Sequence, residues 1–116
     1  MSLDVRAILD GQVWPQNVHD FGGDNVDILD EQLALLNDDE RADAAQQVLA
    51  LLADPDILIR SYAVLSLRRA KNIVGEDAVR DALAEHHAHL AVPGAPMWQV
   101  HHDTLWDEAQ YRLLYD

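Results

Sequence analysis

The sequence contains no cysteine, one lysine and one phenylalanine, and its hydrophobic runs are all short. Without cysteine the chain has no disulfide, no thiolate metal site and no thiol nucleophile. A membrane span needs about 20 consecutive apolar residues, and the N-terminus lacks the basic and apolar stretches of a signal peptide. We therefore expect a cytoplasmic protein without a membrane segment.

Positive charge is scarce as well. Eight basic residues stand against 21 acidic ones, which gives a net charge of −13. Affinity for nucleic acid comes largely from Lys and Arg side chains that neutralise phosphates, so binding to DNA, RNA or anionic lipid is not expected. A basic protein partner would suit this charge, although solubility alone also accounts for it.

Motifs of catalysis and nucleotide binding are missing. No Gly-rich loop precedes a Lys-Ser or Lys-Thr pair, and residues 22–23 lead into acids that repel phosphate. The spaced acids Asp24, Asp27, Asp30 and Glu31 do not follow the order of a calcium loop, which needs a Gly midway and a Glu at its end. No serine stands in a Gly-x-Ser-x-Gly elbow. We expect no cofactor and favour a non-enzymatic protein.

The chain is rich in Leu, Ala and other aliphatic residues at helical spacing. Its 116 residues and 49% hydrophobic fraction suit one all-α domain over residues 1–116. We expect the irregular segment 11–25 to be anchored in the core by Trp14 and Phe21. Helix breakers and caps predict six helices, over about residues 3–10, 27–36, 38–53, 55–71, 76–90 and 103–115.

The third and fourth helices have the clearest ends. Asn37 is a good N-cap, and the acids that follow it suit a helix N-terminus. Asp54 is expected to cap the fourth helix, with Pro55 at the first helical position, where its missing N–H costs nothing. This helix is apolar nearly all round, which predicts burial between neighbours. It ends with Arg68, Arg69 and Lys71, where the helix dipole favours cations.

One segment at the centre of the chain has a distinctive order of residues. It is Asp54-Pro55-Asp56-Ile57-Leu58-Ile59-Arg60-Ser61-Tyr62-Ala63-Val64-Leu65-Ser66-Leu67, after Val48-Leu49-Ala50-Leu51-Leu52. With this motif, residues 48–90 resemble a HEAT repeat, an armadillo-like helical unit, of the short bacterial kind also seen in the family grouped with phycobiliprotein lyases. In that family a leucine-rich helix ends at Asp-Pro, followed by an aliphatic residue and Arg, then Ala and Leu at four- and seven-residue steps. Arg68 stands where the family commonly has Gly.

The resemblance implies a short HEAT-like α-α superhelix of about six helices, stacked side by side. Residues 27–53 would form a divergent helical pair before the HEAT-like unit. About three repeats are usually needed for stability, so the first helix and the helix at 103–115 would act as caps, or the chain would dimerise. Small Ala63 would let two helices approach, Leu67 would fill the next groove, and Arg60 would pair with a nearby acid. Lyase activity is not implied.

Histidines form the most suggestive cluster. Imidazole and carboxylate ligands suit zinc or nickel, and histidines three apart on a helix share one face. The spacing matches no established metal motif, and a second interpretation is that the histidines solvate a helix C-terminus, where positive charge is favourable. The candidate metal ligands are His86, His89, His101 and His102, with Glu85 and Asp103 nearby.

The aromatic segment 93–115 carries Trp98, Trp106, Tyr111 and Tyr115, and Trp and Tyr are favoured at interfaces. Its other interpretation, which we prefer, is that Trp106 packs inward as part of a cap. Taken together, the sequence predicts a non-enzymatic HEAT-like module that binds another protein or a second copy of itself. One alternative is an acidic inhibitor or antidote of a basic partner. The other is a histidine-based metal enzyme or sensor.

Overall fold

Helices make up nearly all of the chain that the computed structural model describes, which is residues 3–11, 25–93 and 104–115. These ranges hold eight α-helices, one short 3₁₀ helix and an isolated bridge between Pro93 and Thr104. The predicted all-α class is confirmed. The elements are α1 (Val5–Leu9), α2 (Asn25–Ala34), α3 (Asp38–Ala50), η1 (Leu51–Ala53), α4 (Ile57–Leu65), α5 (Leu67–Val74), α6 (Glu76–Glu85), α7 (His87–Leu90) and α8 (Leu105–Tyr115).

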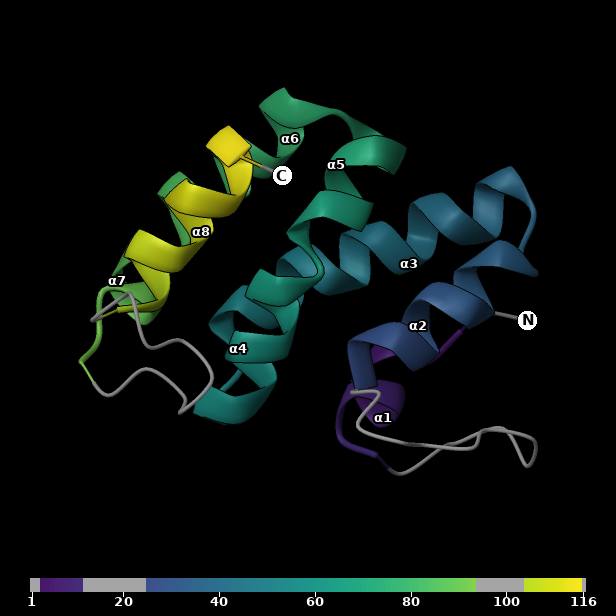
Figure 1. The fold of residues 1–116 in the computed structure, drawn as a ribbon, viewed down its shortest axis with the longest axis horizontal. Helices are drawn as coiled ribbons and strands as arrows, with labels where there is room; N and C mark the ends of the chain where they lie inside the picture. The colour runs from purple at the N-terminus through teal and green to yellow at the C-terminus, as the bar shows by residue number, and fades with distance from the viewer. Residues whose placement is uncertain (1–2, 12–24, 94–103, 116) are drawn as a thin grey trace.

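Helices that follow one another in the chain pack as pairs. α3 and η1 run back against α4 and α5, and α8 runs back along α6 and α7 (Figure 1). α1 packs on α2 and also reaches α3, while α8 also packs on α4 and α5. The segment formed by α4 and α5 therefore lies at the centre, with the other pairs on either side of it.

The position of α4 explains its apolar sequence. Ile59, Ala63 and Val64 are completely buried, as the prediction of a helix enclosed by neighbours requires. Ser61 is also buried, and its hydroxyl donates to the carbonyl of Ile57 at 2.7 Å, which satisfies the only polar group on that side chain. One side of the helix stays open, where Leu58 is 41% exposed, and the buried sides supply much of the core.

The start of α4 differs from the prediction. The N-cap is Asp56, whose side chain accepts from the Leu58 N–H at 2.9 Å, so Asp54 does not cap the helix and Pro55 lies before it. Asp54 instead turns inward and is 8% exposed. Its carboxylate accepts from the Asp56 N–H at 2.9 Å and binds Arg6, a partner that lies far away in the sequence. A long-range ion pair thus replaces the expected local cap.

The predicted helix 55–71 is divided at Ser66 into α4 and α5. The Ser66 hydroxyl donates to the Tyr62 carbonyl at 2.8 Å, a bond to the preceding turn that bends helices. As a consequence, Arg68 and Arg69 lie in the first turn of α5 and only Lys71 lies in its last turn. The expectation that all three cations complement a helix C-terminus is therefore wrong for the two arginines.

The predicted helix 76–90 is divided at His86, where the backbone has φ −102° and ψ 17°. This conformation lies near the sparsely populated bridge region, outside the helical minimum. The change of direction sends α7 against η1 and α8, and Leu90 is completely buried there.

The corner between α2 and α3 is closed by polar contacts. Asn37 and Glu40 form a capping box, with Asn37 Oδ1 accepting from the Glu40 N–H at 2.8 Å, which confirms the predicted cap. Arg41 reaches back from α3 and donates to the carbonyls of Leu33 and Ala34 at 2.9 and 3.3 Å. These bonds satisfy the C-terminal carbonyls of α2, which explains why it ends before residue 36.

The two outer helices also have side-chain caps. Asp4 accepts from the Ala7 N–H, so α1 begins two residues later than predicted. Thr104 Oγ1 accepts from the Asp107 N–H at 3.2 Å at the start of α8, as one of the two predicted caps. Trp14 and Phe21 lie outside the described residues. Over the ranges that are described, no helix has the length and hydropathy to traverse a bilayer.

Candidate functional site

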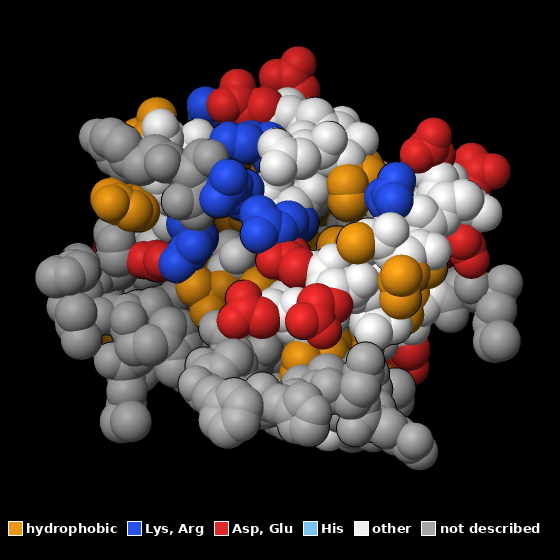
Figure 2. Space-filling model, turned by 45° about the vertical axis from the view of Figure 1, so that its right-hand side comes forward, with side chains coloured by type: hydrophobic (Ala, Val, Ile, Leu, Met, Phe, Trp, Pro, Cys, Tyr) orange, Lys and Arg blue, Asp and Glu red, His pale blue; other side chains and the backbone are white. Residues whose placement is uncertain are grey.

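Basic residues are unevenly distributed over the molecule. All eight lie in described helices, and five of them lie on α5, α6 and α8, which pack together. Figure 2 shows most of the Lys and Arg side chains in one band, with hydrophobic side chains between this band and a separate basic side chain to its right. α5 contributes three cations and no acid to this face. The five residues, called the basic band below, are Arg68, Arg69, Lys71, Arg80 and Arg112.

Three members of the basic band are neutralised by acids. Arg69 binds Asp30 of α2 at 2.7 Å, Arg112 binds Glu108 at 2.8 Å, and Arg80 lies 3.4 Å from Glu76. The other two, Arg68 and Lys71, make no ion pair or hydrogen bond with any part of the chain that is described. The exposed edge of α5 therefore carries uncompensated positive charge on a protein whose net charge is −13.

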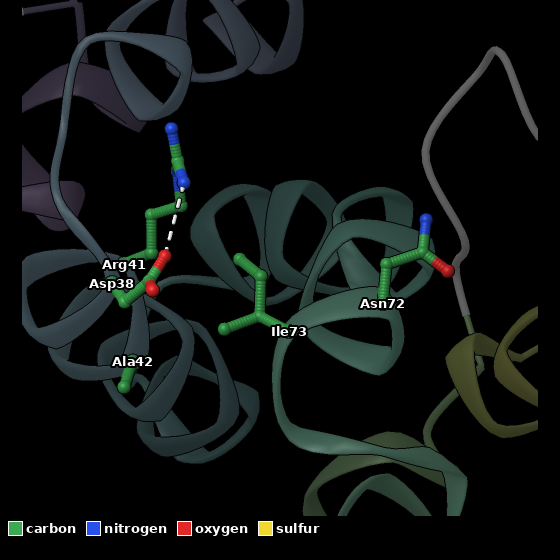
Figure 3. Close-up of a pocket in the computed structure, with 5 residues that line it drawn as sticks. All are labelled: Asp38, Arg41, Ala42, Asn72 and Ile73. Carbon is green, nitrogen blue, oxygen red and sulfur yellow. Dashed lines mark hydrogen bonds and ion pairs between the residues drawn. The ribbon is translucent and has the colours of Figure 1, made fainter.

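A groove of about 270 Å³ lies beside these cations, between the start of α3 and the end of α5. In Figure 3 the Ile73 side chain extends into the space between the two helices, with Arg41 on one side and Asn72 on the other. Asn72 stands four residues after Arg68, so the two are neighbours on the exposed face of α5. The groove is lined by Asp38, Arg41, Ala42, Asn72 and Ile73.

The two sides of the groove differ in charge. On the α3 side the Asp38 side chain is fully exposed at 101% and only 3.4 Å from Arg41, which is itself held by the α2 carbonyls. Asp39 and Glu40 follow it in the same helical turn. On the α5 side the lining residues Asn72 and Ile73 are neutral, and Arg68 lies one helical turn before Asn72. A ligand that fills the groove and extends along α5 would therefore meet Asp38 and Arg41 at one end and Arg68 at the other.

The residues of the HEAT-like motif occupy the interior. Ala63 and Leu67 are buried, which agrees with the expectation that they pack against neighbouring helices. Asp54 binds Arg6 Nε at 2.7 Å and Nη2 at 3.3 Å. The hydrogen bond from Arg6 lowers the pKa of the Asp54 carboxyl, against the opposing effect of burial. The carboxylate thus stays charged and ties α1 to the turn before α4.

Arg60 does contact Asp54, but through the backbone carbonyl rather than the carboxylate. The prediction that it pairs with an acid of the motif is thus only partly met. Its Nε is buried without a hydrogen-bond partner among the described residues. Because the guanidinium is committed to the turn before α4, it is not available to a ligand.

The structure describes half of the candidate metal set. His86 and His89 lie together, with ring centroids 6.0 Å apart, whereas His101 and His102 lie outside the described residues. His87 packs edge-on against Trp106 at 4.4 Å between centroids. No group of three metal-ligating side chains forms among the residues that are placed. A histidine metal site stays a prediction, and metal analysis of the purified protein tests it.

The aromatic segment 93–115 is also described only in part. Trp106 is half-buried against His87, in line with a cap that packs inward, while Tyr111 is 48% exposed. Leu113 is buried as well, whereas Leu114 is 68% exposed. Trp98 and the side chain of Tyr115 lie outside the described residues. The exposed part of α8 adjoins the basic band through Arg112, the neighbour of Tyr111 in the sequence.

The sequence did not predict the groove or a binding role for the cations on α5. Arg68 and Arg69 follow Leu67 in the sequence, but in a helix predicted to continue to residue 71 they would complement the helix dipole, so no other role was expected. Only the break at Ser66 removes that explanation. None of the family models, curated proteins or solved structures with which the chain was compared matches it.

Proposed function

We propose that this chain is a non-enzymatic protein-interaction module of HEAT-like type. The observation that supports it most is the groove between α3 and α5, whose lining residue Asn72 lies one helical turn after Arg68. Open grooves between packed helices, lined by a few apolar and polar side chains, suit a peptide or loop of another protein. Cations left unpaired beside such a groove give it an electrostatic preference.

The HEAT-like assignment rests on the motif at 54–67 and on the pairing of neighbouring helices. α3 with α4–α5, and α6–α7 with α8, repeat one antiparallel arrangement, which is how units of a helical solenoid are built. In such proteins the surfaces between units serve as binding sites. Assignment to this class therefore predicts a binding role without requiring any catalytic group.

The acidic-inhibitor alternative gains less support. It requires the carboxylates to gather on one face, yet acids occur on α2, α3, α6 and α8 and around the ends of α1. Many of them occupy helix starts or bind arginine, as Asp30 and Asp54 do. The part of the surface whose charge differs most from the negative charge of the whole chain is the basic band.

Filling the groove tests the proposal. Ala42 lies exposed on α3 in the groove lining, so Ala42→Trp blocks the space without entering the core. Ala84 is an equally exposed alanine on α6, and Ala84→Trp is the matched control. In quantitative affinity capture from a cell lysate, wild type and Ala84→Trp should enrich the same protein and Ala42→Trp should lose it.

Two results contradict the proposal. One is that no protein is enriched by the wild type over the bead control. The other is that Ala42→Trp and Ala84→Trp lose the captured protein equally, because the groove would then have no special part in binding. Circular dichroism of the three proteins checks that their helical content is the same.

A further inference from the structure

We infer that the groove and the two unpaired cations of α5, Arg68 and Lys71, together bind an acidic segment of a partner protein, with one apolar side chain in the groove and carboxylates along α5. This inference rests on the proposed function and adds the chemistry of the partner. It is carried by the positions of Arg68 and Lys71, their lack of acidic partners within the described chain, and the adjoining groove.

The charges on α5 are not explained by the stability of the helix. Arg68 lies in the first turn, where the partial charge of the helix end is positive and disfavours a cation. Arg69 occupies the same turn but is compensated by Asp30 at 2.7 Å. Arg68 has no such compensation from any residue that the structure describes, so its presence weakens α5 slightly and indicates a different use.

The shape of the surface limits what can bind. Arg68 and Asn72 are neighbours one turn apart on the exposed edge, with Lys71 beside them, so the positive charge forms a short row. The row leads through Asn72 to the groove, where Ala42 and Ile73 provide the apolar lining. About 270 Å³ is enough for a side chain such as Leu or Phe, and it lies just below the range of small-molecule and cofactor sites, which begins at about 300 Å³.

A protein segment fits these observations better than a nucleic acid. Nucleic-acid binding requires many cations that neutralise phosphates, and here three of the five members of the basic band are already paired. A chain with a net charge of −13 also repels a long polyanion. A short segment with two or three carboxylates loses much less to this repulsion.

The test is selection from a displayed library of random 12-residue peptides on the purified wild-type protein. The expected result is enrichment of peptides with two or three Asp or Glu residues spaced around one large apolar residue. The selected peptide is then synthesised with a fluorophore, and its Kd is measured by anisotropy. The Arg68→Glu/Lys71→Glu variant should bind it about tenfold more weakly, because two attractive contacts become repulsive.

The controls use the same protein. Arg80→Glu makes an equal change of charge to Arg68→Glu on an exposed residue of α6, away from the groove, and should alter the Kd less than about twofold. A peptide in which the acids are replaced by lysine should bind the Arg68→Glu/Lys71→Glu variant better than it binds the wild type. This exchange of charges shows that the loss of binding is not a loss of folding.

Several outcomes overturn the inference. Enrichment of neutral or basic peptides, or affinity that is indifferent to Arg68 and Lys71, refutes the acidic partner while leaving a protein-binding role intact. If no peptide is enriched but the capture from lysate succeeds, the acidic partner is refuted and the protein-binding role remains. If both experiments fail, the proposed function is refuted too. Tighter binding of a 20-nucleotide single-stranded DNA than of the peptide refutes it as well. A dimer abolished by Ala42→Trp would assign the groove to a second copy.

Discussion

The helix starts of α3 and α5 lie on opposite helices of one pair and are built in opposite ways. α3 begins with Asn37 in a capping box, followed by three acids in the first turn. α5 begins after Ser66, which makes no side-chain cap bond, and has two arginines in its first turn. The first arrangement satisfies an N–H group with a side chain and complements the helix dipole, while the second has no side-chain cap and places cations at the positive end of the dipole. The start of α3 therefore stabilises the fold, whereas the start of α5 carries positive charge that does not stabilise it.

The start of α4 extends this comparison and provides the largest expected effect. Asp54 is nearly buried and accepts from Arg6 and from the Asp56 N–H, so Asp54→Asn removes charged hydrogen bonds in a partly dry environment. We expect the free energy of unfolding to fall by about 2 kcal/mol. Urea denaturation followed by circular dichroism measures it, and a loss below that of Asp56→Ala would contradict the structural role of the ion pair.

The stabilising effect of Asp54 should depend on pH. The hydrogen bond from Arg6 lowers the pKa of Asp54 below its ordinary value of 3.8. A carboxyl group with a lowered pKa stabilises the fold above its unfolded pKa, and this contribution is lost as the pH falls through its folded pKa. The stability difference between wild type and Asp54→Asn should thus be constant near neutral pH and shrink below pH 3.8. A difference that grows in acid would reverse the assignment.

Removing the cap of α3 should have an intermediate effect. Asn37→Ala removes the side-chain oxygen that accepts from the Glu40 N–H and keeps the backbone N–H that donates to Glu40, and such substitutions cost about 1 kcal/mol. The same urea titration measures this change, with Asn37→Ser as the control because serine also caps helices. Equal stability of Asn37→Ala and wild type would show that the α2–α3 corner is held by Arg41 alone.

The smallest effect has the opposite sign. Arg68→Glu places an acid in the first turn of α5 and should raise the free energy of unfolding by about 0.5 kcal/mol. Lys71→Glu, in the last turn, should lower it by a similar amount. Thermal melts at low ionic strength distinguish the two variants. If both substitutions destabilise the protein, the cations of α5 belong to the fold and the contrast with α3 disappears.

Local interactions made much of this fold predictable. The cap at Asn37 and the burial of Ile59, Ala63 and Val64 follow from residues close together in the sequence, as does the all-helical class. The role of Asp54 did not follow, because its partner Arg6 is 48 residues away and a local cap explained the same Asp-Pro pair.

The candidate site depended on one small deviation. Serine is compatible with a continuous helix, so the residue type of Ser66 does not predict that the helix over 55–71 is divided there. Once the division is known, Arg68 changes from a favourable C-terminal cation to an uncompensated one. The groove could not be predicted because its two sides, around Ala42 and Ile73, come from separate helices and meet only in the packed structure.

The basic band also contains the single lysine of the sequence, Lys71, half-exposed on α5. Every side-chain amine that an acylating reagent can reach is therefore one group, located on the surface proposed to bind the partner. A fluorophore or cross-linker coupled to it would report on that surface alone, apart from the amino terminus. Acylation also removes the positive charge of Lys71 and leaves that of Arg68. A labelled sample is therefore also a variant of the site with one positive charge fewer.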